Sequence, residues 1–268
     1  MSEHSEHKQA PSLARRHLLR VAAATAGRVG ALAALSSLPI VGSSRPANAT
    51  PTVPCFLRGT NILTSKGEAH VEDLMIGDLV VTAGGKAMPI RWIGRNLFKK
   101  AGTRPWPGNV QPILVSRFAI DDKTPHADLY LSPGHALYID GVLIPVKHLI
   151  NGTSITPAMP EGMDAVEYFQ IELETHEVIF AEGTPVESFL VKDGNRENFT
   201  NFVEYERLYR AEPVTYMTPY APIVAYGGGR AELKALLRLA VSPLVDVRDP
   251  IQVAYSRITA RAEELVDC

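Results

Sequence analysis

Between residues 55 and 190 the chain alternates short apolar runs with turn residues, without a sustained helical period. The runs recur about every 8 to 12 residues, a spacing typical of short β-strands joined by tight turns. An amphipathic helix would instead place its apolar residues three and four positions apart. The pattern therefore predicts an all-β fold for this part of the chain.

Three glycine-containing turns between apolar runs predict β-hairpins. These turns are Gly84-Gly85, Asp140-Gly141 and Glu182-Gly183. Asp-Gly is the strongest short hairpin signal, and glycine supplies the positive φ that such turns require. For the first hairpin we expect strands over residues 79–82 and 90–93. The polar, proline-rich residues 98–111 indicate a surface loop between the two halves of the fold.

The pattern changes beyond residue 199. Residues 231–239 follow a run of three glycines and place leucines at positions 233, 236 and 237 on one helical face. We therefore expect a C-terminal extension, residues 200–268, that contains a helix.

The first 49 residues follow the order of an export signal. Arg15-Arg16 precedes the alanine-rich apolar residues 21–41, and Ala47-Asn48-Ala49 offers a small-residue cleavage site. The arginine pair resembles a twin-arginine signal. A membrane anchor is the main alternative, but Arg28 would cost about 2.5 to 3.5 kcal/mol near the bilayer centre. We expect a bacterial protein, periplasmic or secreted, with no membrane span once the signal is removed.

The composition of the chain excludes several classes of function. The chain has 268 residues and a formal net charge of −2, so it lacks the basic surface of a nucleic-acid-binding protein. Its two cysteines, Cys55 and Cys268, cannot form a disulfide framework or a four-thiolate zinc site. Twenty glycines and twenty prolines fit a turn-rich chain.

Cys55 stands at the start of a series of stretches that resembles the Hint domain, the self-processing module of Hedgehog proteins and inteins. The matching stretches are Cys55 to Thr64 with the later Gly77-Asp78, Leu131 to His135, Tyr168 to Phe180, and His176 to Leu190. The resemblance is closest to the bacterial Hint-domain proteins. It implies a compact, pseudo-two-fold β horseshoe over residues 50–199, with a small C-terminal helical appendage.

The same residues suit an N-to-S acyl shift. The Cys55 thiol would attack the carbonyl of Pro54 and convert the amide into a thioester. His135 would protonate the leaving amine, because an imidazole exchanges protons near neutral pH. Ser132 would hydrogen-bond the scissile carbonyl or orient the imidazole, since the intervening Pro-Gly turn brings it beside His135. His176 would assist from another strand.

Each candidate also has a structural interpretation. Cys55 could be a small buried apolar residue, and His135, His176 and Ser132 could serve only hydrogen bonds of their own turns and strands. Zinc bound by His135, His148 and His176 is discounted, because no two of them have a spacing typical of zinc ligands. We therefore predict no metal and no cofactor.

Differences between this sequence and the family limit the reactions that we expect. The chain has no His-Asn junction, so splicing is not expected, and residues 200–268 show no recognisable sterol site. Ser188 stands where Hedgehog proteins have a cysteine, and Pro54 replaces the usual small glycine. The thioester would react with an external nucleophile, namely water, a thiol or an amine. No protein partner can be named.

Three hypotheses follow. The first is autocatalytic cleavage at Cys55, without turnover of a separate substrate. The second is a catalytically dormant Hint fold that acts as a structural or binding module. The third is an unrelated β-rich secreted enzyme.

Overall fold

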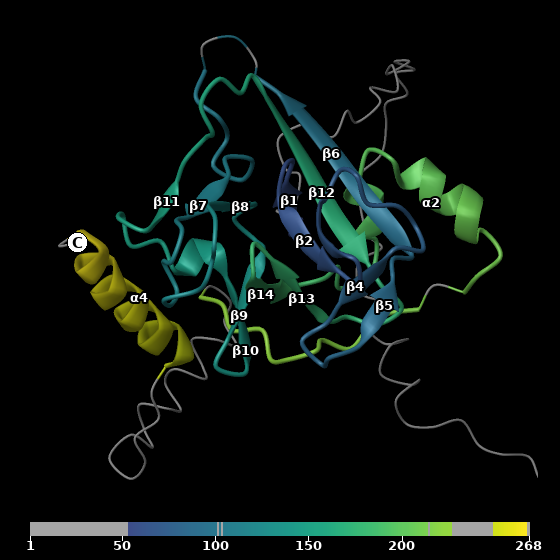
Figure 1. The fold of residues 1–268 in the computed structure, drawn as a ribbon. Coiled ribbons are helices and arrows are strands. Elements are labelled where there is room, and N and C mark those ends of the chain that lie inside the picture. The colour runs from purple at the N-terminus through teal and green to yellow at the C-terminus, as the bar shows by residue number, and fades with distance from the viewer. Residues whose placement is uncertain (1–52, 101, 103, 214, 227–248, 267–268) are drawn as a thin grey trace, which may run out of the picture. The chain divides into compact units, whose positions relative to one another are not determined.

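The structure is a computed structural model, and it describes residues 53–100, 102, 104–213, 215–226 and 249–266. Its strands are β1 (Phe56–Leu57), β2 (Asn61–Thr64), β3 (Gly67–His70), β4 (Leu79–Val81), β5 (Ala87–Pro89), β6 (Trp92–Lys99), β7 (Ile113–Val115), β8 (Leu129–Leu131), β9 (Ala136–Ile139), β10 (Val142–Pro145), β11 (Ile155–Pro157), β12 (Ala165–Glu172), β13 (Val178–Ala181) and β14 (Thr184–Glu187). Its helices are α2 (Phe202–Tyr209), α4 (Pro250–Val266) and the 3₁₀ turns η1 (Val146–His148) and η2 (Arg196–Asn198). The predicted all-β fold with a small C-terminal helical part is confirmed (Figure 1).

The strands form two antiparallel sheets. The first has the order β11-β7-β8-β1-β12-β6, and the second has the order β10-β9-β14-β13-β2-β4-β5, with β3 paired to β2. Each sheet takes strands from both sides of the loop that follows β6 (Figure 1). The two halves of the chain are therefore interleaved, and β1 lies in the middle of the first sheet, between β8 and β12.

The three predicted hairpins are present. Strand β9 pairs with β10 and β13 with β14, and both turns place their Asp or Glu and the following glycine at positive φ. In the first hairpin, β4 pairs with β5, and Gly85 alone of the two glycines has a positive φ, 76°. That turn needs a single left-handed residue.

The predicted strand over residues 90–93 is only half formed, because Trp92 and Ile93 begin β6 whereas Ile90 and Arg91 lie between β5 and β6, where the chain changes sheets. Ile90 donates its N–H to Asp78 on the β4 side, whereas Arg91 donates to Glu172 at the end of β12. Strand β6 then extends to Lys99, paired with Ala165, so the predicted loop begins at residue 100. Backbone pairing with β12 decides this boundary.

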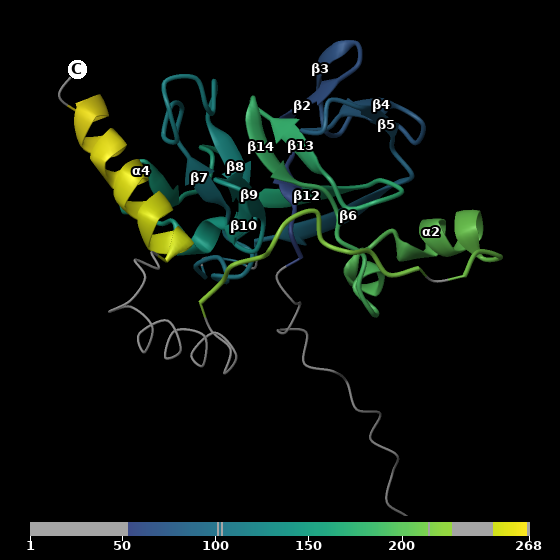
Figure 2. The ribbon, with the colours of Figure 1, turned by 90° about the horizontal axis from the view of Figure 1, so that it is seen from below.

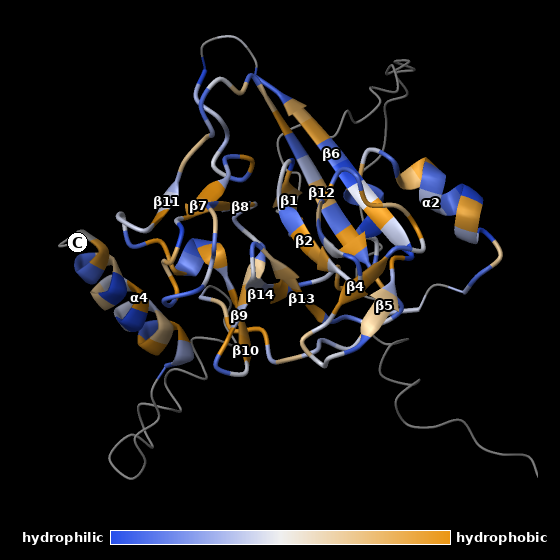
Figure 3. Cartoon of the chain, viewed as in Figure 1, coloured by the Kyte–Doolittle hydropathy of each residue, from blue (hydrophilic) through white to orange (hydrophobic). Residues whose placement is uncertain are grey.

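Two helices were not expected from the sequence. Helix α2 buries none of its residues, and α4 places Ile251, Ala254 and Ile258 in the same core cluster as the strands. Figure 3 shows both helices and the long strands β6 and β12 mixing hydrophobic and hydrophilic residues, whereas β7 and β10 are mainly hydrophobic. The predicted helix over residues 231–239 and the predicted export signal lie outside the described residues. Within the described residues, no helix is long and apolar enough to cross a bilayer.

Candidate functional site

Cys55 and Ser132 lie opposite each other where β1 and β8 run side by side. Cys55 immediately precedes β1, and Ser132 immediately follows β8. The Ser132 N–H donates to the Cys55 carbonyl at 2.9 Å, and the Cys55 N–H donates to Ser132 Oγ at 2.8 Å. The strand pairing therefore brings together two residues that are 77 positions apart in the chain.

The Ser132 hydroxyl contacts both sides of the Pro54 residue. It accepts the N–H of Cys55, the amide of the proposed scissile bond, and it donates to the carbonyl of Val53 at 2.8 Å. Sequence reasoning placed this hydroxyl on the scissile carbonyl or on the imidazole. The structure instead places it on the amide nitrogen and on the preceding carbonyl, where it fixes the chain on either side of Pro54.

His135 is completely buried directly before β9. Its Nε2 lies 3.1 Å from the carbonyl oxygen of Glu187. A carbonyl only accepts hydrogen bonds, so Nε2 carries the proton and Nδ1 is the unprotonated nitrogen of the neutral ring. Among the residues that the structure describes, Nδ1 has no hydrogen-bond partner. The turn after Ser132 thus presents a neutral imidazole with one unused acceptor nitrogen.

Burial lowers the pKa of His135 from 6.5 to about 4. The carboxylate of Glu187 and the backbone of Cys55 and Glu187 oppose this lowering, and nearby His176 adds to it. His135 is therefore neutral at pH 7 and can act as a proton acceptor. Its ring also packs on Phe56 of β1, with a centroid distance of 4.4 Å.

His176 joins the same cluster from the segment before β13. Its Nδ1 accepts the backbone N–H of Tyr220 at 2.9 Å, and its Nε2 lies 3.5 Å from Glu187 Oε2, outside hydrogen-bond geometry. Glu187 Oε1 accepts the N–H of Ala136, beside His135. Glu187 therefore links the two histidines, and all three side chains are buried.

Glu187 was missed by the sequence analysis. The sequence holds one signal for it, because an acidic residue ends β14 after Pro185 and Val186. A glutamate at the end of a strand can equally face solvent, so the sequence alone did not indicate a buried carboxylate. The third zinc candidate, His148, lies apart from this cluster and packs its ring against Tyr226. Among the described residues, no group of three or more His, Cys, Asp or Glu side chains is arranged to hold a metal ion.

The Cys55 thiol lies in an apolar, closed environment. Its residue is 1% exposed, and burial raises the pKa of the thiol well above its usual range. Beside it is a pocket with about 20 Å³ of room for the centre of a water molecule, enough for one water. The pocket is lined by Val53, Cys55, Asn96, Phe98, Asn109, Val110, Ser132 and Tyr168.

Comparisons with known proteins found one family and several solved structures that are similar to part of this chain. The Hint domain family matches residues 54–193. Among solved structures, the gp41-1 intein is 12% identical, with 50% of this chain and 97% of that chain covered and a TM-score of 0.33. A DnaB intein from Synechocystis sp. PCC 6803 is 10% identical, covering 50% and 98%, with a TM-score of 0.35. An intein-like domain from Clostridium thermocellum is 13% identical, covering 50% and 97%, with a TM-score of 0.34. No curated protein matches the chain.

Proposed function

The chain belongs to the Hint domain family, and we propose on this basis that it cleaves its own Pro54-Cys55 peptide bond through an N-to-S acyl shift. The Hint fold supports self-processing in general. The observation that carries the specific proposal is the Ser132 hydroxyl, which accepts the Cys55 N–H and donates to the Val53 carbonyl. Those two hydrogen bonds fix the chain on both sides of Pro54, the residue whose carbonyl is attacked.

The proposed reaction begins with the transfer of the Cys55 thiol proton to Nδ1 of His135. The Sγ atom then bonds to the carbonyl carbon of Pro54, and the carbon–nitrogen bond to Cys55 breaks. His135 returns the proton to the departing Cys55 nitrogen, which leaves a thioester between Pro54 and Cys55. A neutral imidazole with an unpartnered Nδ1 fits this acceptor-then-donor role.

We propose that water resolves the thioester. The pocket beside Cys55 has room for one water without movement of the chain, whereas an added thiol or amine with a larger substituent reaches the thioester only when the pocket opens. The water oxygen would bond to the Pro54 carbonyl carbon, the carbon–sulfur bond would break, and the thiol of Cys55 would be regenerated with a new Pro54 carboxylate. Splicing is not part of this proposal, since no His-Asn junction is available.

The test is a tagged chain in which the tag precedes Pro54. We expect release of the tag, accelerated by dithiothreitol or hydroxylamine, because both cleave thioesters far faster than amides. Cys55→Ala abolishes release, and His135→Ala slows it by about 10² to 10⁴, the usual size of a general acid–base contribution. Ser132→Ala also slows release, whereas Ser132→Thr, which keeps a hydroxyl, retains more of it.

Isotope labelling identifies the nucleophile. Cleavage in ¹⁸O-water without added thiol places one ¹⁸O atom in the new Pro54 carboxylate, read by mass spectrometry of the released fragment. A fragment modified by a buffer amine or thiol instead would overturn the assignment of water. Release that survives Cys55→Ala indicates a contaminating protease and contradicts the acyl shift.

The second candidate is a dormant Hint fold that serves as a structural or binding module. The burial of Cys55 favours it, because a thiol whose pKa is raised ionises poorly. This candidate predicts that the tag stays attached in the presence of thiol. Tag retention by a folded wild-type chain would select it over self-processing.

A further inference from the structure

Residues 215–226, here called the strap, follow the part of the chain matched by the Hint family and return to the candidate site. Figure 2 shows them as the yellow-green ribbon that runs from the α2 side back across the sheets. The Met217 N–H donates to Val191 at 3.1 Å. The strap therefore continues along the end of the Hint-like part.

The strap then pairs with the edge of the second sheet. Leu143 in β10 donates to Pro222 and accepts from Val224, both at 2.9 Å, and forms a parallel bridge with Ile223. Ala221 is buried among strand residues, and the ring of Tyr220 packs on Tyr138 with a centroid distance of 5.7 Å. The strap thus covers an edge strand that would otherwise have unpaired backbone groups.

Between these anchor points the strap reaches His176. The Tyr220 N–H donates to Nδ1 of His176, a side chain that is fully buried. A backbone N–H can only donate, so Nδ1 is unprotonated and the neutral ring carries its proton on Nε2. That proton faces Oε2 of Glu187, 3.5 Å from Nε2.

Glu187 passes this constraint on to His135. Its carboxylate lies between the His176 ring and the Ala136 N–H, and its carbonyl accepts from Nε2 of His135. The wrong tautomer of His176 would direct a lone pair at a buried carboxylate, which is repulsive. The orientation of the Glu187 carboxylate depends on the tautomer that the strap selects, and this carboxylate in turn holds the Ala136 N–H, the amide next to His135.

We propose that the strap completes the self-processing site: the Tyr220 N–H fixes the tautomer of His176, and His176 acts as a positioning residue for Glu187 and His135. This inference rests on the proposed function for its effect on cleavage, but the tautomer is measurable without cleavage. A segment that lies outside the family match thereby has a role in the chemistry.

The test compares Tyr220→Pro, which removes the N–H, with Tyr220→Ala, which keeps the N–H and removes the ring. Both are made in the full chain with Cys55→Ala, and ¹⁵N NMR reads the protonation of the imidazole nitrogens. We expect His176 in the parent chain and in Tyr220→Ala to be protonated on Nε2. In Tyr220→Pro we expect that preference to be lost and the His135 nitrogen signals to shift.

A second variant distinguishes displacement of the strap from misfolding caused by the introduced proline. Ala221→Lys adds a charge at a buried position packed on β9, β10 and β13, so it displaces the strap while keeping the Tyr220 N–H. It should produce the same ¹⁵N changes. An Nδ1-protonated His176 in the parent chain, or unchanged His135 signals in both strap variants, would overturn the proposal.

With Cys55 restored, Tyr220→Pro should slow tag release by about three- to tenfold, the range for one lost hydrogen bond, and Tyr220→Ala should not. If the parent chain releases no tag, the proposed self-processing fails, while the ¹⁵N result still decides whether the strap positions the histidines. If the parent cleaves and Tyr220→Pro cleaves equally fast, the strap has no part in the reaction.

Discussion

A single hydroxyl, that of Ser132, uses both of its hydrogen-bonding capacities on the chain around Pro54. Strong donor and acceptor roles are both available to serine and threonine, whereas a cysteine thiol offers both only weakly and alanine and valine offer neither. The sequence pattern pointed to Ser132, Cys55 and His135 as one group. It could not indicate which atoms meet, because that depends on the register between β1 and β8.

His135 should make stability depend on pH. The unfolded chain binds a proton near pH 6.5, whereas the folded chain binds it only near pH 4, so the unfolded state holds more protons between these values. Stability therefore rises with pH across this window and falls on acidification. From pH 7 to pH 5 the loss attributable to His135 is about 2 kcal/mol.

Urea unfolding of the Cys55→Ala chain at pH 7 and pH 5 measures this loss. The matched control is His135→Gln in the same background, which keeps a side-chain donor for the Glu187 carbonyl but does not titrate. An equal loss of stability in both chains would show that other groups cause the acid sensitivity.

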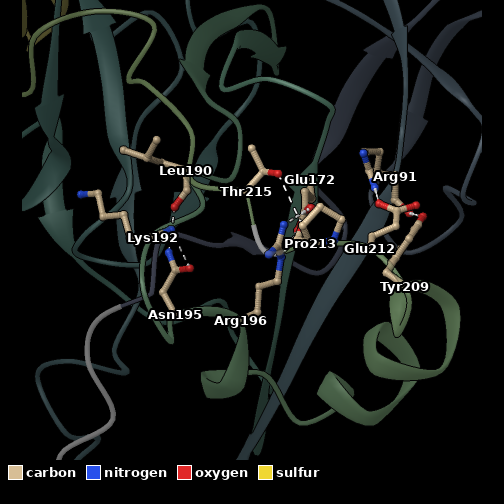
Figure 4. A network of polar contacts seen from close by, with 10 residues as sticks. All are labelled: Arg91, Glu172, Leu190, Lys192, Asn195, Arg196, Tyr209, Glu212, Pro213 and Thr215. Carbon is tan, nitrogen blue, oxygen red and sulfur yellow. Dashed lines mark hydrogen bonds and ion pairs between the residues drawn. The ribbon is translucent and has the colours of Figure 1, made fainter. Parts of the chain in front are cut away.

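The elements after the Hint-like part are attached to it by polar contacts, one of them buried and one partly exposed (Figure 4). Arg196 of η2 binds Glu172 at the end of β12 through two hydrogen bonds, of 2.8 and 2.6 Å, and its guanidinium lies over the ring of Tyr205 in α2. Arg91, before β6, pairs with Glu212 beyond α2. Together with the packing of Tyr205 and Tyr209 on the apolar cluster that contains Trp92, these contacts hold α2 in place.

Arg196→Met should be strongly destabilising. It leaves the carboxylate of Glu172, which is 1% exposed, without its counter-charge, and breaking a buried pair costs about 3 to 5 kcal/mol. Arg257→Met is the control, because the Arg257–Asp140 pair is half exposed and such pairs contribute about 0 to 1 kcal/mol. Chemical denaturation of both variants measures the difference, and similar losses would contradict the role given to Arg196.

At the scale of elements, the turn residues predicted the hairpins better than the apolar period predicted the helices. The hairpins at Asp140 and Glu182 were predictable because positive φ is a local property of the turn residues. Helix α4 was not, since alanines occupy part of its buried stripe and weaken the apolar period. Its docking on the strands, through residues such as Ile251 and Ile258, supplies what the local pattern lacks.

At the scale of the whole molecule, we propose that residues 1–49 direct export and that the chain functions outside the bacterial cytoplasm. The basis is the Arg15-Arg16 pair ahead of an apolar stretch. A fusion of residues 1–54 to a reporter should cross the membrane, and Arg15→Lys with Arg16→Lys should block it. Normal export of the double variant would exclude the twin-arginine interpretation.

The amino-acid sequence was sufficient for the properties that depend on local chemistry, namely the β-rich pattern and the hairpin turns. It also supplied Cys55, Ser132, His135 and His176 as candidates for the proposed acyl shift. Glu187 and the Tyr220 N–H became visible only in the folded chain. Their roles depend on which backbone and carboxylate oxygens meet the two imidazoles across strands and across the strap. Such contacts arise from pairing between segments far apart in the chain, and no local pattern of residues encodes them.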